Sequence, residues 1–316
     1  MIDRRTLLAT ALATAGTALT GPARAANPVF RIGYQKNGIL VVAKQQGVLE
    51  ARLKALGYDV RWTEFSFGPP LLEALNLGGI DFGQTGDAPP IFAQAAGSDL
   101  AYVAAQAAAG SGAAILVAET SPIRTLADLK GKRVAFAKAS SAHNLTLAAL
   151  AKAGLTYGDI TPVTLAPADA AAAFASGQID AWTIWDPYFA IAQGRAGVRV
   201  LALATDIARP NNFFLANRTV AQAKPRIVEA VVEALSGVAA WCEANRHEVA
   251  AILSRGTGVP LAATERAVAR TDYVIGPVTP DLVSEQQAIA DRFHAAGLIP
   301  KPIRVADAVW VAPPNG

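Results

Sequence analysis

The sequence has few of the residues that most often carry covalent or metal chemistry, with one cysteine and three histidines among 316 residues. A lone cysteine, Cys242, cannot form an intramolecular disulfide, so we expect the hydrophobic core to stabilise the fold. The histidines (His143, His247 and His294) are too few and too scattered to predict a metal site, and the helix around His247 lacks the second histidine of a zinc-protease pair. We therefore expect no metal and no cofactor.

Several other signals are missing. Beyond the N-terminus, no segment has the ~18 unbroken apolar residues of a membrane-spanning helix. There is no phosphate-binding loop, no dinucleotide-binding glycine motif and no nucleophile elbow. The net charge of +3 is not gathered into a basic face, which argues against a nucleic-acid partner. A triad of Ser141, His143 and Asp87 is conceivable. However, a serine and a histidine two apart at one helix start point in different directions, so a secreted hydrolase is a distant alternative.

The first 25 residues are predicted to be a signal peptide. Arg4 and Arg5 form a basic start, an apolar stretch runs from Leu7 to Leu19, and Ala23-Arg24-Ala25 supplies the small-x-small cleavage pattern. No cysteine lies near the predicted cleavage site, so we expect no lipoprotein anchor. The paired arginines resemble a twin-arginine signal, but a Sec signal can also carry two arginines, so both routes stay open. We expect a periplasmic, monomeric mature protein.

From Asn27 onward, short apolar strands alternate with helices, which predicts an α/β fold with mainly parallel sheets. The alternation restarts near Glu119, and after Asn211 the pattern becomes mostly helical. We expect residues 26–119 and 211–316 to form lobe one and residues 120–210 to form lobe two. Two crossovers near Glu119 and Asn211 would then act as a hinge that closes the lobes on a ligand.

Ligands of open α/β sheets bind beyond the carboxyl ends of the strands. The residues just after, or just before, the predicted strands are therefore the candidate ligand-binding residues. They are mostly hydroxyls, amides, glycine and an aromatic, which suits a small polar solute. They are Gln35, Gly86, Asp87, Ser140, Ser141, Ala142, His143, Trp185, Asp186 and Asn212.

The segment from Ala137 to Leu145 is the sharpest of these signals. Serine before an apolar helical run predicts a helix N-cap, and the first amides of such a helix can bind an anion. Plain capping explains the serines equally well. We expect His143 to be neutral, because the positive helix end disfavours its protonation. We also expect Trp185 to face the cleft as an apolar wall and Trp182 to face the packing.

Two remaining candidates are acidic. Asp87 and Asp186 would repel an anion if they faced it, but they would be harmless as helix caps or as hydrogen-bond acceptors between the lobes.

Six motifs, in order along the mature chain, resemble those of the periplasmic aliphatic-sulfonate-binding proteins. Nitrate-, taurine- and thiamine-precursor-binding proteins are relatives of that group with the same fold. The motifs are Gly33-Tyr34-Gln35-Lys36, Glu73–Asn76 with Gly79-Ile80-Asp81, Thr85-Gly86-Asp87 with Pro89–Gln94, Ser140-Ser141 with His143-Asn144, Pro167–Ala170, and Asp180–Trp182 with Ile184–Tyr188.

This resemblance implies a two-lobed type II periplasmic-binding-protein fold with a ligand cleft between the lobes. It also implies closure on the ligand and delivery to an ABC permease with a cytoplasmic ATPase. The family-like ligand positions are Gln35, Gly86, Asp87, Ser140, Ser141, His143, Trp185 and Asp186. One departure is Ala139, where relatives often have glycine.

The sequence thus predicts a binding protein and no enzyme. Its expected solute is an aliphatic sulfonate, whose head would lie on the amides of Ser141, Ala142 and His143 and on a serine hydroxyl. Its alkyl tail would lie against Trp185. The alternative solutes are taurine, nitrate or a thiamine-precursor-like compound.

Overall fold

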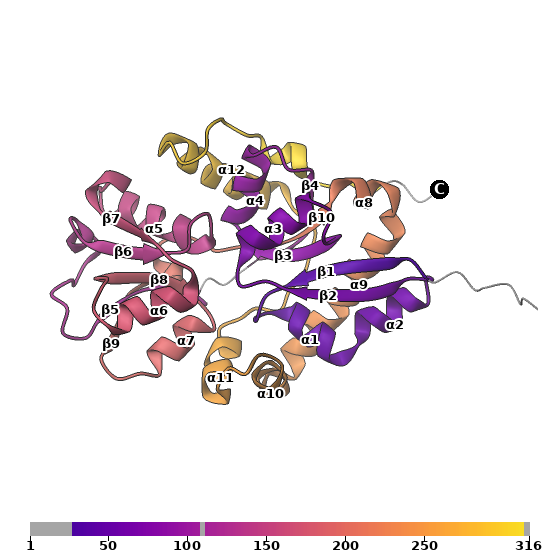
Figure 1. Ribbon diagram of the computed structural model, residues 1–316, viewed down its shortest axis with the longest axis horizontal. Helices are drawn as coiled ribbons and strands as arrows, with labels where there is room; N and C mark the ends of the chain where they lie inside the picture. The colour runs from indigo at the N-terminus through magenta and orange to yellow at the C-terminus, as the bar shows by residue number, and fades with distance from the viewer. Residues whose placement is uncertain (1–26, 108–110, 313–316) are drawn as a thin grey trace, which may run out of the picture.

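Short apolar runs form ten strands among the residues that the computed structural model describes, 27–107 and 111–312. These strands make two five-stranded sheets, one in each of two lobes (Figure 1). The predicted signal peptide, residues 1–25, lies outside the described residues. The α/β class and the two-lobed arrangement predicted from the sequence are confirmed.

The first sheet has the order β2-β1-β3-β10-β4 and the second has the order β7-β6-β8-β5-β9. The strands of the first sheet are β1 (Val29–Tyr34), β2 (Asp59–Glu64), β3 (Phe82–Gly86), β4 (Leu100–Gln106) and β10 (Asn212–Asn217). The strands of the second are β5 (Ala113–Ala118), β6 (Arg133–Phe136), β7 (Thr161–Thr164), β8 (Ala181–Trp185) and β9 (Val198–Leu203).

The sheets are mixed, so the prediction of mainly parallel sheets is wrong. In the first sheet β1 pairs in parallel with β2 and β3, but β10 is antiparallel to both β3 and β4. In the second, β6 pairs in parallel with β7 and β8, but β5 is antiparallel to both β8 and β9. The reason is the crossovers. Strands β5 and β10 follow the two passages between the lobes. Strand β5 therefore begins where β8 ends, and β10 begins where β3 ends.

The first crossover lies earlier than predicted. Strand β5 pairs only with strands of the second sheet, so the chain has already entered the second lobe at Ala113 and does not cross near Glu119. The apolar run of β5 reads like one more strand of the preceding βα series, and its pairing partners are not visible in the sequence. The chain returns to the first sheet with β10, which begins at Asn212.

Helices cover both faces of each sheet. In the first lobe they are α1 (Ile39–Gln46), α2 (Val48–Lys54), α3 (Gly68–Asn76), α4 (Ala88–Ala95), α8 (Arg218–Ala223), α9 (Pro225–Ala244), α10 (Arg246–Thr257), α11 (Leu261–Ala269), α12 (Pro280–Ala295) and the 3-10 turn η4 (Val305–Ala308). In the second lobe they are α5 (Ser141–Lys152), α6 (Pro167–Ala175), α7 (Tyr188–Gln193) and the 3-10 turns η1 (Leu126–Leu129), η2 (Tyr157–Asp159) and η3 (Ala204–Asp206).

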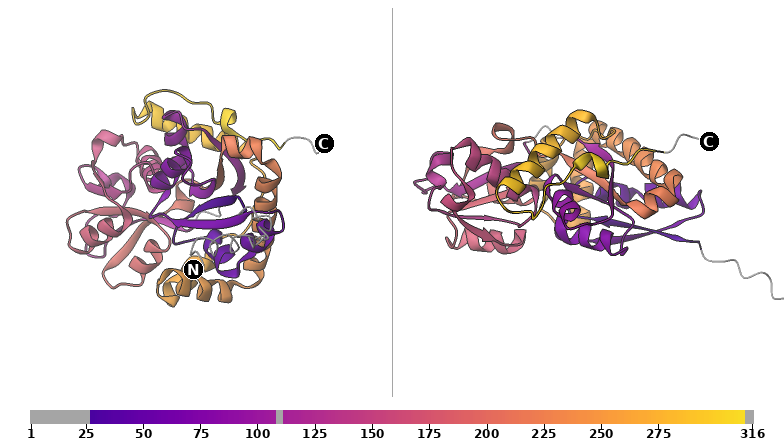
Figure 2. Two further views of the ribbon diagram at one scale, coloured as in Figure 1. Left: turned by 45° about the vertical axis from the view of Figure 1, so that its right-hand side comes forward. Right: turned by 90° about the horizontal axis from the view of Figure 1, so that it is seen from above.

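Helix α5 occupies a special place because it is buried on nearly all sides. Every residue from Ala142 to Leu150 is buried, including the polar His143, Asn144 and Thr146. The helix packs on β8 and β6 of its own lobe and against α4 and α12 of the first lobe. Figure 2 shows α12 (yellow) reaching across to the second lobe. This packing fixes the start of α5 at the boundary between the lobes.

No helix within residues 27–107 and 111–312 is long and apolar enough to cross a membrane.

Candidate functional site

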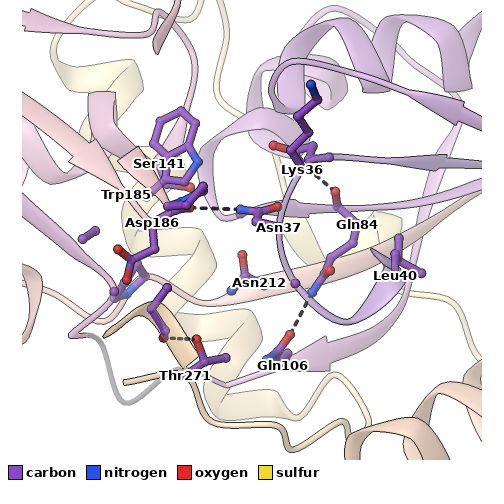
Figure 3. A pocket seen from close by; sticks show the side chains of 18 of the residues that line it. Lys36, Asn37, Leu40, Gln84, Gln106, Ser141, Trp185, Asp186, Asn212 and Thr271 are labelled. Carbon is purple, nitrogen blue, oxygen red and sulfur yellow. Dashed lines mark hydrogen bonds between the residues drawn. The ribbon is translucent and has the colours of Figure 1, made fainter. Parts of the chain in front are cut away.

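A cavity of about 180 Å³ lies between the two lobes, where strand ends from both sheets meet (Figure 3). Its wall includes the ends of β1, β3 and β8, the start of β10 and the first turn of α5. The predicted site residues that line it are Gln35, Gly86, Ser140, Ser141, Trp185, Asp186 and Asn212. The side chains of the other three, Asp87, Ala142 and His143, lie behind this wall and are buried.

The start of α5 presents two free amides. Ser140 holds the N-cap position with extended backbone (φ −98°, ψ 173°), but its hydroxyl donates to the Ala137 carbonyl at 2.7 Å and does not cap the helix. The His143 amide donates to the Ser140 carbonyl at 2.9 Å, so the prediction that it serves a ligand is wrong. The amides of Ser141 and Ala142 have no acceptor among the residues described here. Such amides form an anion site at a helix end.

The hydroxyl of Ser141 lies directly against the first lobe. A Cβ added at Gly86 would be 1.9 Å from Ser141 Oγ, and Asn212 Oδ1 would be 3.7 Å from the same point. Glycine at position 86 therefore allows α5 to approach the end of β3. Ser141 also stands beside Trp185 in Figure 3, so a polar donor and an aromatic wall share one side of the cavity.

Ala139 turns the chain into α5 with a left-handed backbone (φ 59°). Glycine adopts this conformation without a steric cost, whereas alanine is strained there. Its amide donates to His143 Nδ1 at 3.2 Å, which supports the turn. Alanine at this position thus adopts a conformation that glycine adopts more readily.

His143 is part of the packing between the lobes. Its ring lies 4.6 Å from that of Phe136 and 5.1 Å from that of Phe293, measured between centroids, and Phe92 is also in contact. Burial lowers the pKa of His143 to about 4, with a smaller effect from Lys138. The expectation of a neutral histidine agrees with this lowered pKa. The His143 side chain does not line the cavity, however, so the prediction that it is a ligand-binding residue is wrong.

Asp87 also lies behind the cavity, as the N-cap of α4. Its Oδ1 accepts from the Ala88 amide at 2.7 Å, and its Oδ2 accepts from Asn144 Nδ2 of the second lobe at 2.7 Å. Burial raises the pKa of Asp87 to about 6, against the opposing hydrogen bonds from Asn144 and Ser141. The carboxylate is thus both a helix cap and an acceptor between the lobes, the harmless arrangement considered from the sequence.

Asp186 lines the cavity but is paired with a cation. Its Oδ2 lies 3.0 Å from Arg270 Nε, and its Oδ1 accepts from the Ala190 amide at 3.0 Å. Its backbone carbonyl accepts from Asn37 Nδ2 of the first lobe at 3.3 Å. Burial raises the pKa of Asp186 to about 6, and Arg270 opposes this shift.

Sequence reasoning missed Arg270 because it follows helix α11 and not a strand. Its guanidinium stacks over the Phe189 ring at 4.0 Å. No strand-end rule could have placed it beside Asp186.

Gln84 and Gln106, which sequence reasoning missed, form another wall of the cavity together with the predicted Gln35. Gln84 Nε2 donates to Gln106 Oε1 at 2.8 Å, and Gln106 Nε2 donates to the Asp272 carbonyl at 2.6 Å. Gln35 Nε2 donates to the backbone carbonyl of Gln84 at 3.1 Å. The available signal was Gln106, a polar residue at the end of the apolar run of β4, because a buried amide needs partners.

The two tryptophans of β8 lie as predicted. Trp182 is 2% exposed and packs beside Phe174, whereas Trp185 is partly exposed and lines the cavity. Three positions apart on one strand place them on opposite faces.

A cavity enclosed by two α/β lobes, with polar groups contributed by both, defines a solute-binding protein of the periplasmic-binding type. The chain belongs to the NMT1-like family, whose model matches residues 30–254. It is 44% identical to the structure of the periplasmic aliphatic sulphonate binding protein SsuA from Escherichia coli, with a TM-score of 0.83 over 90% of this chain and 92% of that one.

Two further relatives are informative. The alkanesulfonate-binding protein SsuA from Xanthomonas axonopodis pv. citri, solved with MOPS bound, is 45% identical, with a TM-score of 0.84 over 90% of this chain and 99% of that chain. The taurine-binding periplasmic protein of Escherichia coli is 31% identical over 42% of this chain and 41% of its own length. The resemblance drawn from the six motifs is confirmed.

Gly86→Ala should destabilise the protein, because the new Cβ would overlap Ser141 Oγ. We expect a loss of about 1–3 kcal/mol in the free energy of unfolding, the usual cost of overpacking. Gly276→Ala is the matched control, since its Cβ meets nothing within 4 Å and its φ is not positive. Urea unfolding measures both. The same change made in a Ser141→Gly background should cost less, and an equal cost would contradict the proposed contact.

Asp87 should make stability depend on pH between about 4 and 6. Its pKa is raised in the folded state, so the folded protein binds more protons in that window and its stability falls as pH rises. Asp186 acts in the same direction, and His143, with its lowered pKa, acts in the opposite one. The test is therefore a difference. Relative to Asp87→Asn, the wild type should lose stability from about pH 4 to about pH 6 and change little above.

Urea unfolding at a series of pH values measures this difference, with the exposed Asp169→Asn as the control for a change of one carboxylate. A constant difference between wild type and Asp87→Asn across the window would show that Asp87 does not titrate there.

Proposed function

We propose that this chain is an extracytoplasmic solute-binding protein that captures an aliphatic sulfonate for ABC import. The observation that carries the proposal is the start of α5. Ser141 lines the cavity beside Trp185, and the amides of Ser141 and Ala142 at this helix start have no acceptor among the described residues. Sequence identities of 44% and 45% to two SsuA proteins support the same solute class.

The chemistry of the site suits a sulfonate. Its three oxygens accept hydrogen bonds and stay unprotonated at neutral pH, so the site needs donors and no proton transfer. The helix amides provide those donors. The Ser141 hydroxyl has one proton, so it would donate to the sulfonate in place of Asp87. The head would lie on Ser141 and Ala142, without the His143 amide, and the tail would extend along Trp185.

The acids near the site do not oppose this charge. Asp87 is held behind the wall by its hydrogen bonds, and Asp186 is paired with Arg270. Other side chains of the predicted set, Gln35 and Asn212, would complete the wall around the alkyl tail.

The hydrolase alternative loses its chemical basis in this geometry. His143 Nδ1 accepts from the Ala139 amide, and Nε2 has no hydrogen-bond partner among the described residues. The ring therefore makes no hydrogen bond to Ser141 and cannot activate its hydroxyl without moving.

Delivery of the solute needs a transporter and a cellular compartment in which the two proteins meet. We infer that the mature protein acts in the periplasm as a monomer, after export by the twin-arginine or the Sec route. It would deliver its solute to a permease with a cytoplasmic ATPase. Closure of the lobes, through the crossovers before Ala113 and before Asn212, would retain the solute on the way.

A ligand panel tests the solute class. Ethane-, butane- and hexanesulfonate and MOPS should each raise the melting temperature of the mature protein, because a ligand that binds only the folded state stabilises it by about 2.7 kcal/mol at a hundred times its Kd. Nitrate has no tail to lie on Trp185 and should act weakly, and taurine is the third comparison. If nitrate or taurine alone shifts the melting temperature, the sulfonate proposal is wrong.

Two substitutions test the pose. Ser141→Ala removes a hydrogen bond to a charged group, worth about 1.5–3 kcal/mol, and should weaken binding about ten-fold or more at every chain length. Trp185→Ala should cost more affinity as the alkyl chain grows, because it removes apolar contact worth ~25 cal/mol per Å². Calorimetry with ethane- and hexanesulfonate measures both, and Trp241→Ala, on α9 away from the cavity, is the control.

The pose would be refuted by two results together: equal weakening of the short and long sulfonates in Trp185→Ala, and no weakening in Ser141→Ala.

A further inference from the structure

A chain of buried hydrogen bonds joins the two lobes behind the cavity. Asn144 Nδ2 of α5 donates to Asp87 Oδ2 of the first lobe at 2.7 Å. Arg292 Nη1 of α12, also in the first lobe, donates to Asn144 Oδ1 at 2.7 Å. Asp87 is 0% exposed and Asn144 is 2% exposed, so water does not compete for these bonds. Both the nitrogen and the oxygen of the Asn144 side-chain amide are thereby bonded to groups of the first lobe.

This chain of hydrogen bonds extends to the proposed anion site. Ser141 hydrogen-bonds the Asp87 carboxylate, one of the interactions that lower the pKa of Asp87. Ser141 and Asn144 lie three positions apart on α5, so they share one face of its first turn. A shift of Asn144 would therefore move the Ser141 hydroxyl and the two free amides with it.

The first lobe also holds Asp87 in place through its backbone. Gln286 of α12 donates through Nε2 to the Asp87 carbonyl at 2.5 Å and to Tyr102 Oη at 3.1 Å. Helix α12 thus holds Asp87 through Gln286 and Asn144 through Arg292. Both of these Gln286 hydrogen bonds lie within the first lobe, whereas Arg292 is bonded to the second.

The charge on Arg292 has a function that a neutral donor would not provide. Its attraction favours the ionised form of Asp87. An ionised carboxylate only accepts hydrogen bonds, and here it accepts from Ala88, Asn144 and Ser141. A protonated carboxyl would have to donate one bond, and of these three neighbours only the Ser141 hydroxyl could accept it.

We propose that Arg292 is a positioning residue for the anion site. Through Asn144 and Asp87, it sets the place of Ser141 and of the first turn of α5 relative to the first lobe. Arg292 does not line the cavity, so its effect on a ligand is indirect. It should act on the head group alone and change the affinity for short and long sulfonates by the same factor. This inference rests on the proposed function for its ligand.

The experiment compares Arg292→Met with Arg218→Met. Arg218 is also half-buried on the first lobe, but its Nη2 donates to the carbonyls of Leu100 and Asp307 within that lobe. Both variants should lose some stability. Only Arg292→Met should weaken ethane- and hexanesulfonate binding, each about ten-fold, which corresponds to about 1.4 kcal/mol. Arg292→Lys, which keeps the charge and a donor, should recover part of the affinity and also serves if the methionine variant does not fold.

A measurement without ligand separates this inference from the proposed function. Hydrogen–deuterium exchange of the segment 137–145 should be faster in Arg292→Met than in the wild type and unchanged in Arg218→Met. A wild-type protein that binds no sulfonate would refute the proposed function, and the exchange result would still decide the positioning role. Wild-type affinity in both Arg292 variants with unchanged exchange, or equal weakening in Arg218→Met, would overturn it.

Discussion

The start of helix α5 is the constraint on which the rest of the structure depends. The amides of Ser141 and Ala142 have no acceptor among the described residues, yet they lie at a boundary that both lobes enclose. A buried amide without a partner costs about 1–3 kcal/mol. A solute with several oxygen acceptors removes that cost, and an alkyl group alone does not. The two amides at the start of α5 therefore favour a solute with oxygen acceptors.

Two acids close to an anion site would normally be unfavourable, and the protein resolves this by position. Asp87 is directed away from the cavity into hydrogen bonds with α4 and α5, and Asp186 is held against Arg270. The energetic cost remains visible, since burial raises the pKa of both carboxyls to about 6. Each acid serves the lobes' contact, and neither leaves an uncompensated negative charge at the helix start.

Local sequence signals predicted the fold class, most strands and seven lining residues, because strand ends and helix starts are determined by nearby residues. Signals that depend on pairing were lost. Strand β5 was assigned to the wrong lobe, since an apolar run does not show which sheet it joins. His143 was placed in the cavity because its own helix position fits, whereas two of the aromatic rings around it, Phe92 and Phe293, come from the other lobe. Arg270 was missed for the same reason.

Hydrogen bonds between the lobes lie on both sides of the cavity. On one side Asn37 donates to the Asp186 carbonyl and Arg266 to the Ala190 carbonyl. On the other, Asn144 is bonded to Asp87 and Arg292. A ligand shifts a conformational equilibrium only by its difference in affinity for the two states. These contacts stabilise the arrangement of the lobes seen here, so a change in any of them alters the free energy of that arrangement.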